Sequence, residues 1–205
     1  GNDHRLGANE APPAVVSIFL GEELTAILDS IENDTFFGKQ KKVQMETGAT
    51  VLPHFFKDTT DRNRTSPFAF TGNKFEFRML GSAISVAGPN VVLNTAVAEA
   101  LRQFYEELKD TPEDQMETAI HELLKRSILK HKKVIFNGNG YTDEWLEEAK
   151  KRGLYNLKST PDALPAFIAK KNIDLFTSHH IFTDTEIYSR YEILLENYSK
   201  TLHIE

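Results

Sequence analysis

The sequence of 205 residues contains no cysteine. This absence excludes a disulfide framework, a cysteine nucleophile and a metal site built on thiolates, such as a zinc finger. Long apolar runs are missing too. The longest, Ala14 to Leu20, has the length of a strand, whereas a membrane-spanning helix needs about 18 apolar residues or more. No basic segment precedes an apolar core in the manner of a secretion signal, so we expect neither a membrane segment nor a leader.

Positive charge is in short supply. The 24 lysines and arginines are outnumbered by 30 acidic residues, which gives a net charge of −6 and a pI near 5.7. Because phosphate backbones are bound by clustered cations, this balance disfavours a nucleic-acid binder. Tryptophan occurs once, but 14 phenylalanines and a 40% hydrophobic content are enough for one domain, with or without a helical appendage. The chain opens on Gly1 within a dense polar segment, which we interpret as part of a longer protein.

The first part of the chain is rich in strand patterns. Strands are predicted at Val15 to Leu20, Thr50 to Phe56 and Lys74 to Leu80, and Gly21 opens a helical pattern. Residues 33–48 are polar, and we expect a mobile excursion there. We predict an antiparallel sheet in this part.

From residue 90 onward the patterns are helical. Helices are expected to begin at four threonines: Thr111, Thr142, Thr160 and Thr183. Thr183 also has a glutamate three residues later, as in a capping box. The fold class predicted is α+β, with residues 1–89 containing the sheet and residues 90–205 forming an all-helical region. The first helical pattern contains one apolar stripe at helical spacing: Leu93, Ala96, Val97, Ala100, Leu101, Phe104 and Leu108.

The strand predicted from Lys74 to Leu80 alternates strictly between ionic and apolar residues. Its ionic face presents a cation, a carboxylate and a cation about 7 Å apart. Such a row suits an anionic substrate and a metal ion, while the aromatic face gives the strand a reason to be buried. The ionic residues are Lys74, Glu76 and Arg78, and the apolar ones are Phe75, Phe77 and Met79.

Two further groups of charged residues accompany this strand. Arg62 and Arg64 add two guanidinium groups, whose forks match the oxygens of carboxylates and phosphates. Cross-strand ion pairs on an exposed sheet face are the alternative explanation. Arg5 and Glu10 lie on a loop that contains a glycine and ends in two prolines, where a solvated surface ion pair is the alternative.

Other motifs favour structural explanations. The segment from Gly138 to Gly140 lacks the third glycine of a nucleotide-binding loop and is predicted to be a turn between helices. The basic run from Lys125 to Lys133 fits a solvated helix end. His179 and His180 have no partners at metal-ligand spacing. The tyrosines between Tyr188 and Tyr198 suit core or interface packing.

The two charged groups and the strand, in this order and at this spacing, resemble the C-terminal catalytic portion of glutamine synthetases. The segments that carry the resemblance are GNDHRLGANEAPPA and NRTSPFAFTGNKFEFRMLG, and they are most similar to the type III branch of that family. The helical tail is similar as well, so that the resemblance covers essentially the whole chain. It implies ATP-dependent condensation of glutamate with ammonia to glutamine, through phosphorylation of the glutamate side chain.

The resemblance also implies roles for single residues. Glu10 is similar to the flap glutamate that closes the site and takes a proton from ammonium. Arg5 and Arg78 resemble the arginines that hold the carboxylates of glutamate, and Arg64 resembles the arginine that faces the transferring phosphoryl group.

The nucleotide and metal contacts follow in the same way. Lys74 stands where the family often has an arginine near the nucleotide phosphates, and Glu76 resembles a ligand of the metal that bridges the ATP phosphates. A further arginine of the more familiar branch is replaced here by Ala69, and Arg62 is a candidate substitute. The segment from Gly21 to about Thr60 is an insertion relative to that branch.

For the parent enzyme the resemblance implies a cytoplasmic ring of six or twelve subunits that needs Mg²⁺ or Mn²⁺, with glutamate, ammonium and ATP as substrates. Glu76 would be the only family metal ligand in these residues, so we expect the isolated chain to be inactive. Two alternatives stay open: a helical module for assembly or interaction, and another ATP-dependent carboxylate–amine ligase such as a γ-glutamyl-amine synthetase.

Overall fold

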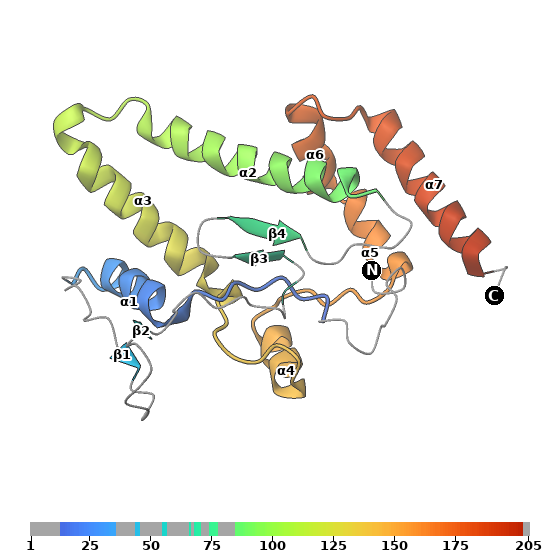
Figure 1. Ribbon diagram of the computed structural model, residues 1–205. Coiled ribbons are helices and arrows are strands. Elements are labelled where there is room, and N and C mark those ends of the chain that lie inside the picture. The colour runs from blue at the N-terminus through green and yellow to red at the C-terminus, as the bar shows by residue number, and fades with distance from the viewer. Residues whose placement is uncertain are drawn as a thin grey trace.

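The protein is mainly helical, with two small antiparallel sheets (Figure 1). The computed structural model describes residues 13–35, 44–45, 55–56, 66, 68–70, 74–77 and 85–202. This arrangement confirms the predicted α+β class with a helical C-terminal region; the boundary between residues 89 and 90 stays a prediction. The α-helices are α1 (Gly21–Glu32), α2 (Ala87–Leu108), α3 (Met116–His131), α4 (Asp143–Lys151), α5 (Thr160–Phe167), α6 (Lys170–Ser178) and α7 (Asp184–Leu202), and the 3-10 turns are η3 (Glu113–Gln115) and η4 (Lys132–Val134).

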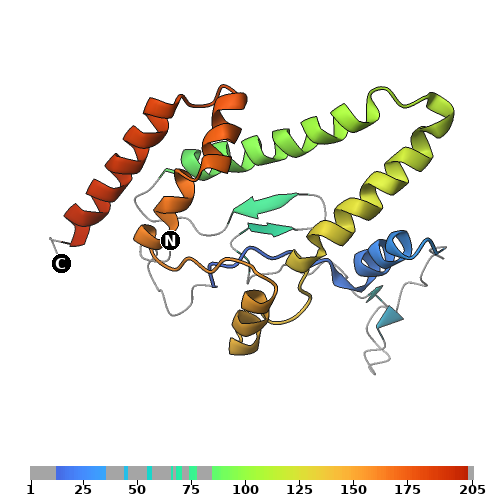
Figure 2. The same ribbon diagram turned by 180° about the vertical axis from the view of Figure 1, so that it is seen from behind.

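Helices α2 and α3 form a V whose arms enclose a β-hairpin, as both views show (Figures 1 and 2). The hairpin consists of β3 (Phe68–Phe70) and β4 (Phe75–Phe77). Helix α1 packs against α3, while α5, α6 and α7 pack against one another beside the far end of α2. No helix in the described part of the chain is long and apolar enough to span a bilayer.

The second sheet pairs β1 (Gln44–Met45) with β2 (Phe55–Phe56). β2 lies within the predicted strand from Thr50 to Phe56. β1 lies within residues 33–48, where a polar excursion was predicted without a strand. A strand this short is held by backbone pairing, which leaves no periodic pattern in a polar sequence.

The segment predicted as a buried strand from Val15 to Leu20 forms only one bridge, in which Ile18 pairs in parallel with Ile135 through backbone hydrogen bonds of 2.8 and 2.9 Å. Val15 and Ser17 are buried, whereas Val16 between them is exposed. This alternation is that of an extended chain with one covered face. The segment thereby joins the N-terminal part of the protein to the turn that follows α3.

One core forms where this segment meets α4. Val15, Trp145 and Ala149 are buried there together. The Phe136 ring stacks on the indole of Trp145, with centroids 3.8 Å apart and planes inclined by 13°. A Cβ atom at Gly138 would lie 2.7 Å from the Phe136 ring, so only glycine fits beneath it. Gly138 thus belongs to a turn that positions this stack, and the turn joins η4 to α4 as predicted.

A second core joins the last three helices. The Phe176 ring of α6 lies 5.6 Å from Phe167 at the end of α5 and 5.5 Å from Phe182, and all three meet at inclined angles. Phe176 and Ile187 of α7 are buried. Offset and tilted ring contacts of this kind contribute beyond the apolar area that they bury.

Local capping signals predicted several helix starts correctly. The Thr142 hydroxyl accepts a hydrogen bond from the Trp145 N–H at the start of α4. At α7 the capping box is complete: the Thr183 N–H donates to the Glu186 carboxylate over 2.8 Å, and the Glu186 N–H donates to the Thr183 hydroxyl over 3.3 Å. α5 begins at Thr160 as predicted, although Ser159 caps it.

One helix start was predicted wrongly. Thr111 does not cap an α-helix, because Pro112 leads into the 3-10 turn η3 and α3 begins only at Met116. Within the apolar stripe predicted on α2, Val97 and Leu101 are exposed.

The start of α1 is capped by a side chain that is distant in sequence. The Asn137 amide oxygen accepts hydrogen bonds from the N–H groups of Leu20 (3.0 Å) and Gly21 (3.3 Å), and its NH₂ group donates to the Thr25 hydroxyl over 2.9 Å. Gly21 has φ +73°, a conformation that favours glycine. Asn137 therefore satisfies helix donors that would otherwise lack partners and ties α1 to the turn before α4.

Candidate active site

The β3–β4 hairpin contains the residues that the sequence singled out. Phe68 pairs with Phe77, Ala69 with Glu76, and Phe70 with Phe75. Directly opposed residues of an antiparallel pair project to the same face. One face of the hairpin therefore has four phenylalanines, and the other has Ala69 and Glu76.

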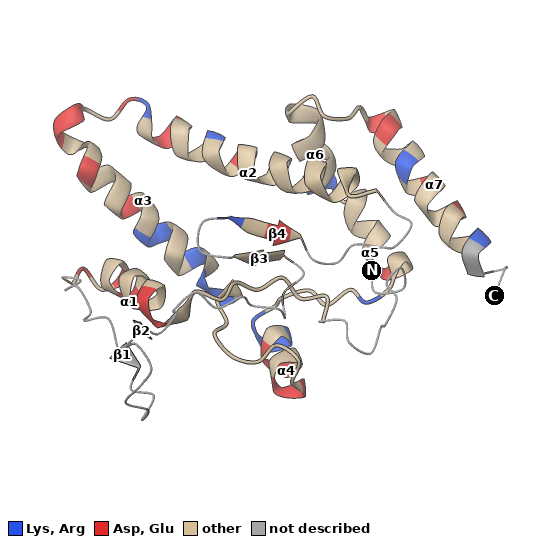
Figure 3. Cartoon of the chain, viewed as in Figure 1, with Lys and Arg blue, Asp and Glu red and all other residues tan. Residues whose placement is uncertain are grey.

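Two residues of the predicted ionic face are described, and they lie close together as predicted. Lys74 and Glu76 lie two residues apart along the chain, and the Lys74 Nζ is 3.9 Å from the Glu76 Oε1. The lysine side chain is the more exposed of the two. An ammonium beside a carboxylate provides one group that attracts phosphate oxygens and one that attracts a divalent cation. β4 has one positive and one negative segment in Figure 3.

Ala69 is completely buried and lies directly across the strand pair from Glu76. The Cβ atoms of such a pair are about 5 Å apart. The position at which the resemblance had suggested a missing arginine is therefore next to the candidate metal ligand.

The aromatic face differs from the prediction. Phe75 is 51% exposed, although the face was expected to be buried. Its ring stacks on Phe68 at a centroid distance of 4.9 Å and contacts Phe70 at 5.1 Å. A two-stranded hairpin has too little area to cover its own apolar face, so the rings shield one another only in part.

Ser66 anchors the hairpin, a role that sequence reasoning missed. Its hydroxyl is buried and accepts hydrogen bonds from the Ser17 N–H (3.2 Å) and the Phe68 N–H (3.3 Å). The same hydroxyl lies 3.1 Å from the Phe68 carbonyl oxygen, to which it donates. Ser66 thereby links the start of β3 to the buried segment around Ser17. A serine within a polar run gives no local signal of such a contact.

The remaining predicted site residues lie outside the described residues: Arg5, Glu10, Arg62, Arg64 and Arg78. Of the predicted set, the structure thus brings Lys74 and Glu76 together. Within the described ranges, no three histidine or acidic side chains gather as a metal cluster. The Glu76 carboxylate is the kind of ligand that Mg²⁺ and Mn²⁺ accept, but a complete site needs further oxygen ligands.

The basic run at the end of α3 was predicted as a solvated helix end, and three of its members form ion pairs at the surface. Lys125 pairs with Asp34, Arg126 with Glu107 and Lys132 with Glu32. Figure 3 shows the positive end of α3 beside the acidic end of α1. Lys125 and His121 together hold the pKa of Asp34 below its ordinary value, with the His121 hydrogen bond as the largest cause. These cations join helices to one another.

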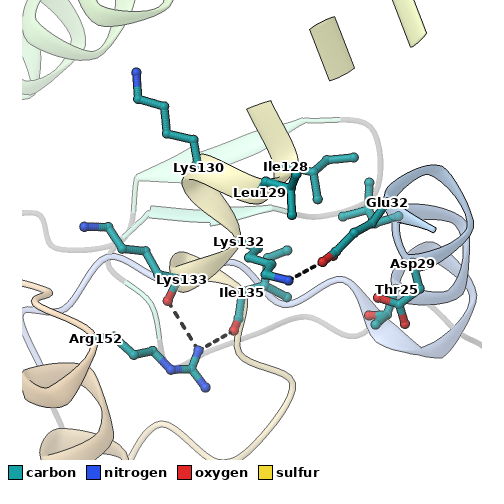
Figure 4. Close-up of a pocket in the computed structure, with 11 residues that line it drawn as sticks. Thr25, Asp29, Glu32, Ile128, Leu129, Lys130, Lys132, Lys133, Ile135 and Arg152 are labelled. Atoms are coloured by element: carbon teal, nitrogen blue, oxygen red, sulfur yellow. Dashed lines mark hydrogen bonds and ion pairs between the residues drawn. The ribbon is translucent and has the colours of Figure 1, made fainter. Parts of the chain in front are cut away.

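A pocket of about 620 Å³ lies between α1 and the end of α3 (Figure 4). The side chains of Lys132 and Glu32 form an ion pair across it. Arg152 donates to the backbone carbonyl oxygens of Ile135 (2.8 Å) and Lys133 (3.3 Å). Because these charged groups already hold neighbouring helices and the turn after α3 together, we assign the pocket a structural role.

The contact between α2 and α6 is polar. The Glu99 carboxylate accepts hydrogen bonds from Arg102 (2.8 Å), Gln103 (2.7 Å) and His179 of α6 (2.8 Å). The Arg102 hydrogen bond is the largest cause that holds the pKa of Glu99 far below its ordinary value of 4.5, followed by those of Gln103 and His179. His179 is thus a partner of Glu99.

The hydrogen bonds of the Glu99 carboxylate predict that the protein loses stability in acid. A carboxyl whose pKa is lowered on folding stabilises the protein above its unfolded pKa, and this contribution is lost as the pH falls below about 4.5. We expect the free energy of unfolding to decline less steeply below that pH in Glu99→Gln than in the parent protein. Urea unfolding between pH 3 and pH 7 (roughly the titration range of carboxyls) measures this. The exposed Glu147→Gln variant should follow the parent curve, and parallel curves for Glu99→Gln would contradict the prediction.

Known proteins share this sequence along its whole length. The family model for the glutamine synthetase C-terminal domain matches residues 119–205. A glutamine synthetase of Butyrivibrio fibrisolvens is 53% identical and a type-3 glutamine synthetase of Dictyostelium discoideum 50% identical, each over 100% of this chain. The chain belongs to the glutamine synthetase family. A glutamine synthetase of Bacteroides fragilis is 41% identical over the same extent.

Membership of the glutamine synthetase family confirms the resemblance that the motifs indicated, including its type III character. The chain covers only 28 to 29% of the length of these relatives. The β3–β4 hairpin thus lies in a segment that matches part of the length of these glutamine synthetases.

Proposed function

We propose that this chain is part of an enzyme that condenses glutamate and ammonia to glutamine at the expense of ATP. The observation that supports the proposal is the ionic face of β4, where Glu76 and Lys74 lie on one side of a strand in a chain of this family. A carboxylate is a poor electrophile, so the side chain of glutamate must first acquire a leaving group. One of its oxygens attacks the γ-phosphorus of ATP and ADP departs; ammonia then attacks the acyl carbon and phosphate departs.

Each candidate site residue would have its own role in this reaction. Glu76 would bind Mg²⁺ or Mn²⁺, which when bound neutralises charge on the ATP phosphates. Lys74 would attract the oxygens of the same phosphates, together with Arg62 and Arg64. Arg5 and Arg78 would hold the carboxylates of glutamate, since guanidinium forks bind carboxylates with two hydrogen bonds. Glu10 would take a proton from ammonium, which makes the nitrogen nucleophilic.

The whole enzyme is proposed to act as a cytoplasmic ring of identical subunits. The ring and its location follow from the family resemblance. The glutamine synthetase relatives are more than three times as long as this chain. Residues outside the chain would therefore supply the other metal ligands.

The test compares the full-length protein with the chain alone. With glutamate, ammonium, ATP and Mg²⁺, we expect the full-length protein to form glutamine, ADP and phosphate in equal amounts. The chain of 205 residues should show no turnover, even in a γ-glutamyl transfer assay with Mn²⁺. Turnover by the short chain would contradict its expected inactivity, and ATP use without glutamine formation by the long one would contradict the proposed reaction.

A further inference from the structure

Helix α2 exposes a row of large apolar side chains, which we call the α2 stripe: Val97, Leu101 and Tyr105. The three are 53%, 61% and 63% exposed. Residues four apart in an α-helix lie on one face, so the row is continuous over two turns. Single exposed apolar residues are common on protein surfaces, but a continuous row of large ones marks a contact surface.

Two polar residues of α2, Thr95 and Glu99, lie on the side turned away from the α2 stripe. Thr95 is buried, and its hydroxyl donates to the Val91 carbonyl oxygen over 2.7 Å. Glu99, one turn further on, is bound to His179 of α6. Thr95 and Glu99 are thus turned toward the protein, while the α2 stripe faces outward. A rotation of α2 that covered the stripe would break the hydrogen bond between Glu99 and His179 at the end of α6.

We propose that the α2 stripe packs, in the full-length protein, against an apolar segment of the same polypeptide that lies outside these 205 residues. More than two thirds of each glutamine synthetase relative lies outside the matched part, so enough polypeptide exists to supply this segment. The inference rests on burial alone and does not depend on the proposed reaction.

The size of the α2 stripe favours this occupant over a second copy of the chain. A stable interface between proteins buries about 800 Å² on each partner, contributed by some 20 to 30 residues. Three side chains that are already partly covered supply much less than that. A segment of the same polypeptide needs no such area, because covalent connection already provides a high effective concentration.

The first experiment measures thiol labelling in the full-length protein. The chain has no cysteine, so Leu101→Cys introduces a single thiol into it, and peptide mapping separates this thiol from any elsewhere. Glu106→Cys, at an exposed position on another side of α2, is the matched control. We expect the thiol at position 101 to react at least about tenfold more slowly than that at 106, because contact excludes the reagent. Similar rates at both positions would overturn the inference. Val97→Cys repeats the measurement should Leu101→Cys fail to fold.

A second experiment identifies the occupant. A photoreactive phenylalanine analogue replaces Tyr105 in full-length protein that is reassembled from equal amounts of light and ¹⁵N-labelled polypeptide. The inference expects cross-links to residues outside this chain, joining light to light and heavy to heavy peptides only. Mixed light–heavy cross-links would show a second copy on the stripe and would overturn it, as would cross-links confined to these 205 residues.

Discussion

Replacing Glu76 with glutamine in the full-length protein is expected to lower the rate of glutamine formation by about 100-fold or more. A charge that is preorganised in a site where phosphoryl charge develops contributes on this scale. Glutamine keeps the size of the side chain but loses the negative charge that binds a divalent cation. The fold should tolerate the change, because Glu76 is partly exposed and its contact with Lys74, 3.9 Å long, is a surface ion pair of small energetic value.

Two measurements separate this effect from damage to the fold. The apparent affinity for Mg²⁺ should weaken in Glu76→Gln, so that raising the metal concentration restores part of the rate. Glu117→Gln, an exposed acid on α3, should keep the activity of the parent. An unchanged rate and metal dependence in Glu76→Gln, with the protein folded, would remove Glu76 from the proposed site.

The features that could be predicted from sequence are those that local rules govern. The period of two in β4 placed Lys74 and Glu76 on one face without any knowledge of their surroundings. The caps of α4 and α7 followed from Thr142 and Thr183, since a cap and its partner lie within three residues of each other. The motifs around the hairpin were sufficient to indicate the family.

The features that could not be predicted depend on partners far away in the sequence. Asn137 caps a helix that starts 116 residues earlier, and the Lys132–Glu32 ion pair joins positions 100 residues apart. Single-sequence patterns contain no information on such pairs. The exposure of Val97 and Leu101 could not be predicted for a related reason: periodicity identifies the apolar face of a helix, but not which neighbour covers it.

Replacing Trp145 with alanine is expected to lower the free energy of unfolding by about 3–5 kcal/mol, the range for deleting a buried aromatic side chain. Trp145 is buried against Val15 and Ala149. Its ring also stacks on Phe136 at 3.8 Å and lies 5.5 Å from the Arg152 guanidinium carbon. All of these contacts disappear together in the variant. Because native domains are stable by only about 5–15 kcal/mol, the loss is large enough to unfold part of the population.

Trp145→Phe offers an intermediate case, because a smaller ring retains part of the stack and should lose less stability than alanine. Urea unfolding followed by far-ultraviolet circular dichroism measures all variants, since helices dominate the fold and the signal does not depend on the indole. Tyr155→Ala, at a position that is 72% exposed, should stay within about 0.5 kcal/mol of the parent.

Trp145 connects the N-terminal segment through Val15 to α4, and that segment holds Ser66 at the start of β3. An ordinary substitution lowers the free energy of unfolding by about 1 kcal/mol. A loss smaller than this in Trp145→Ala would contradict the prediction and would mean that the hairpin is positioned without this core.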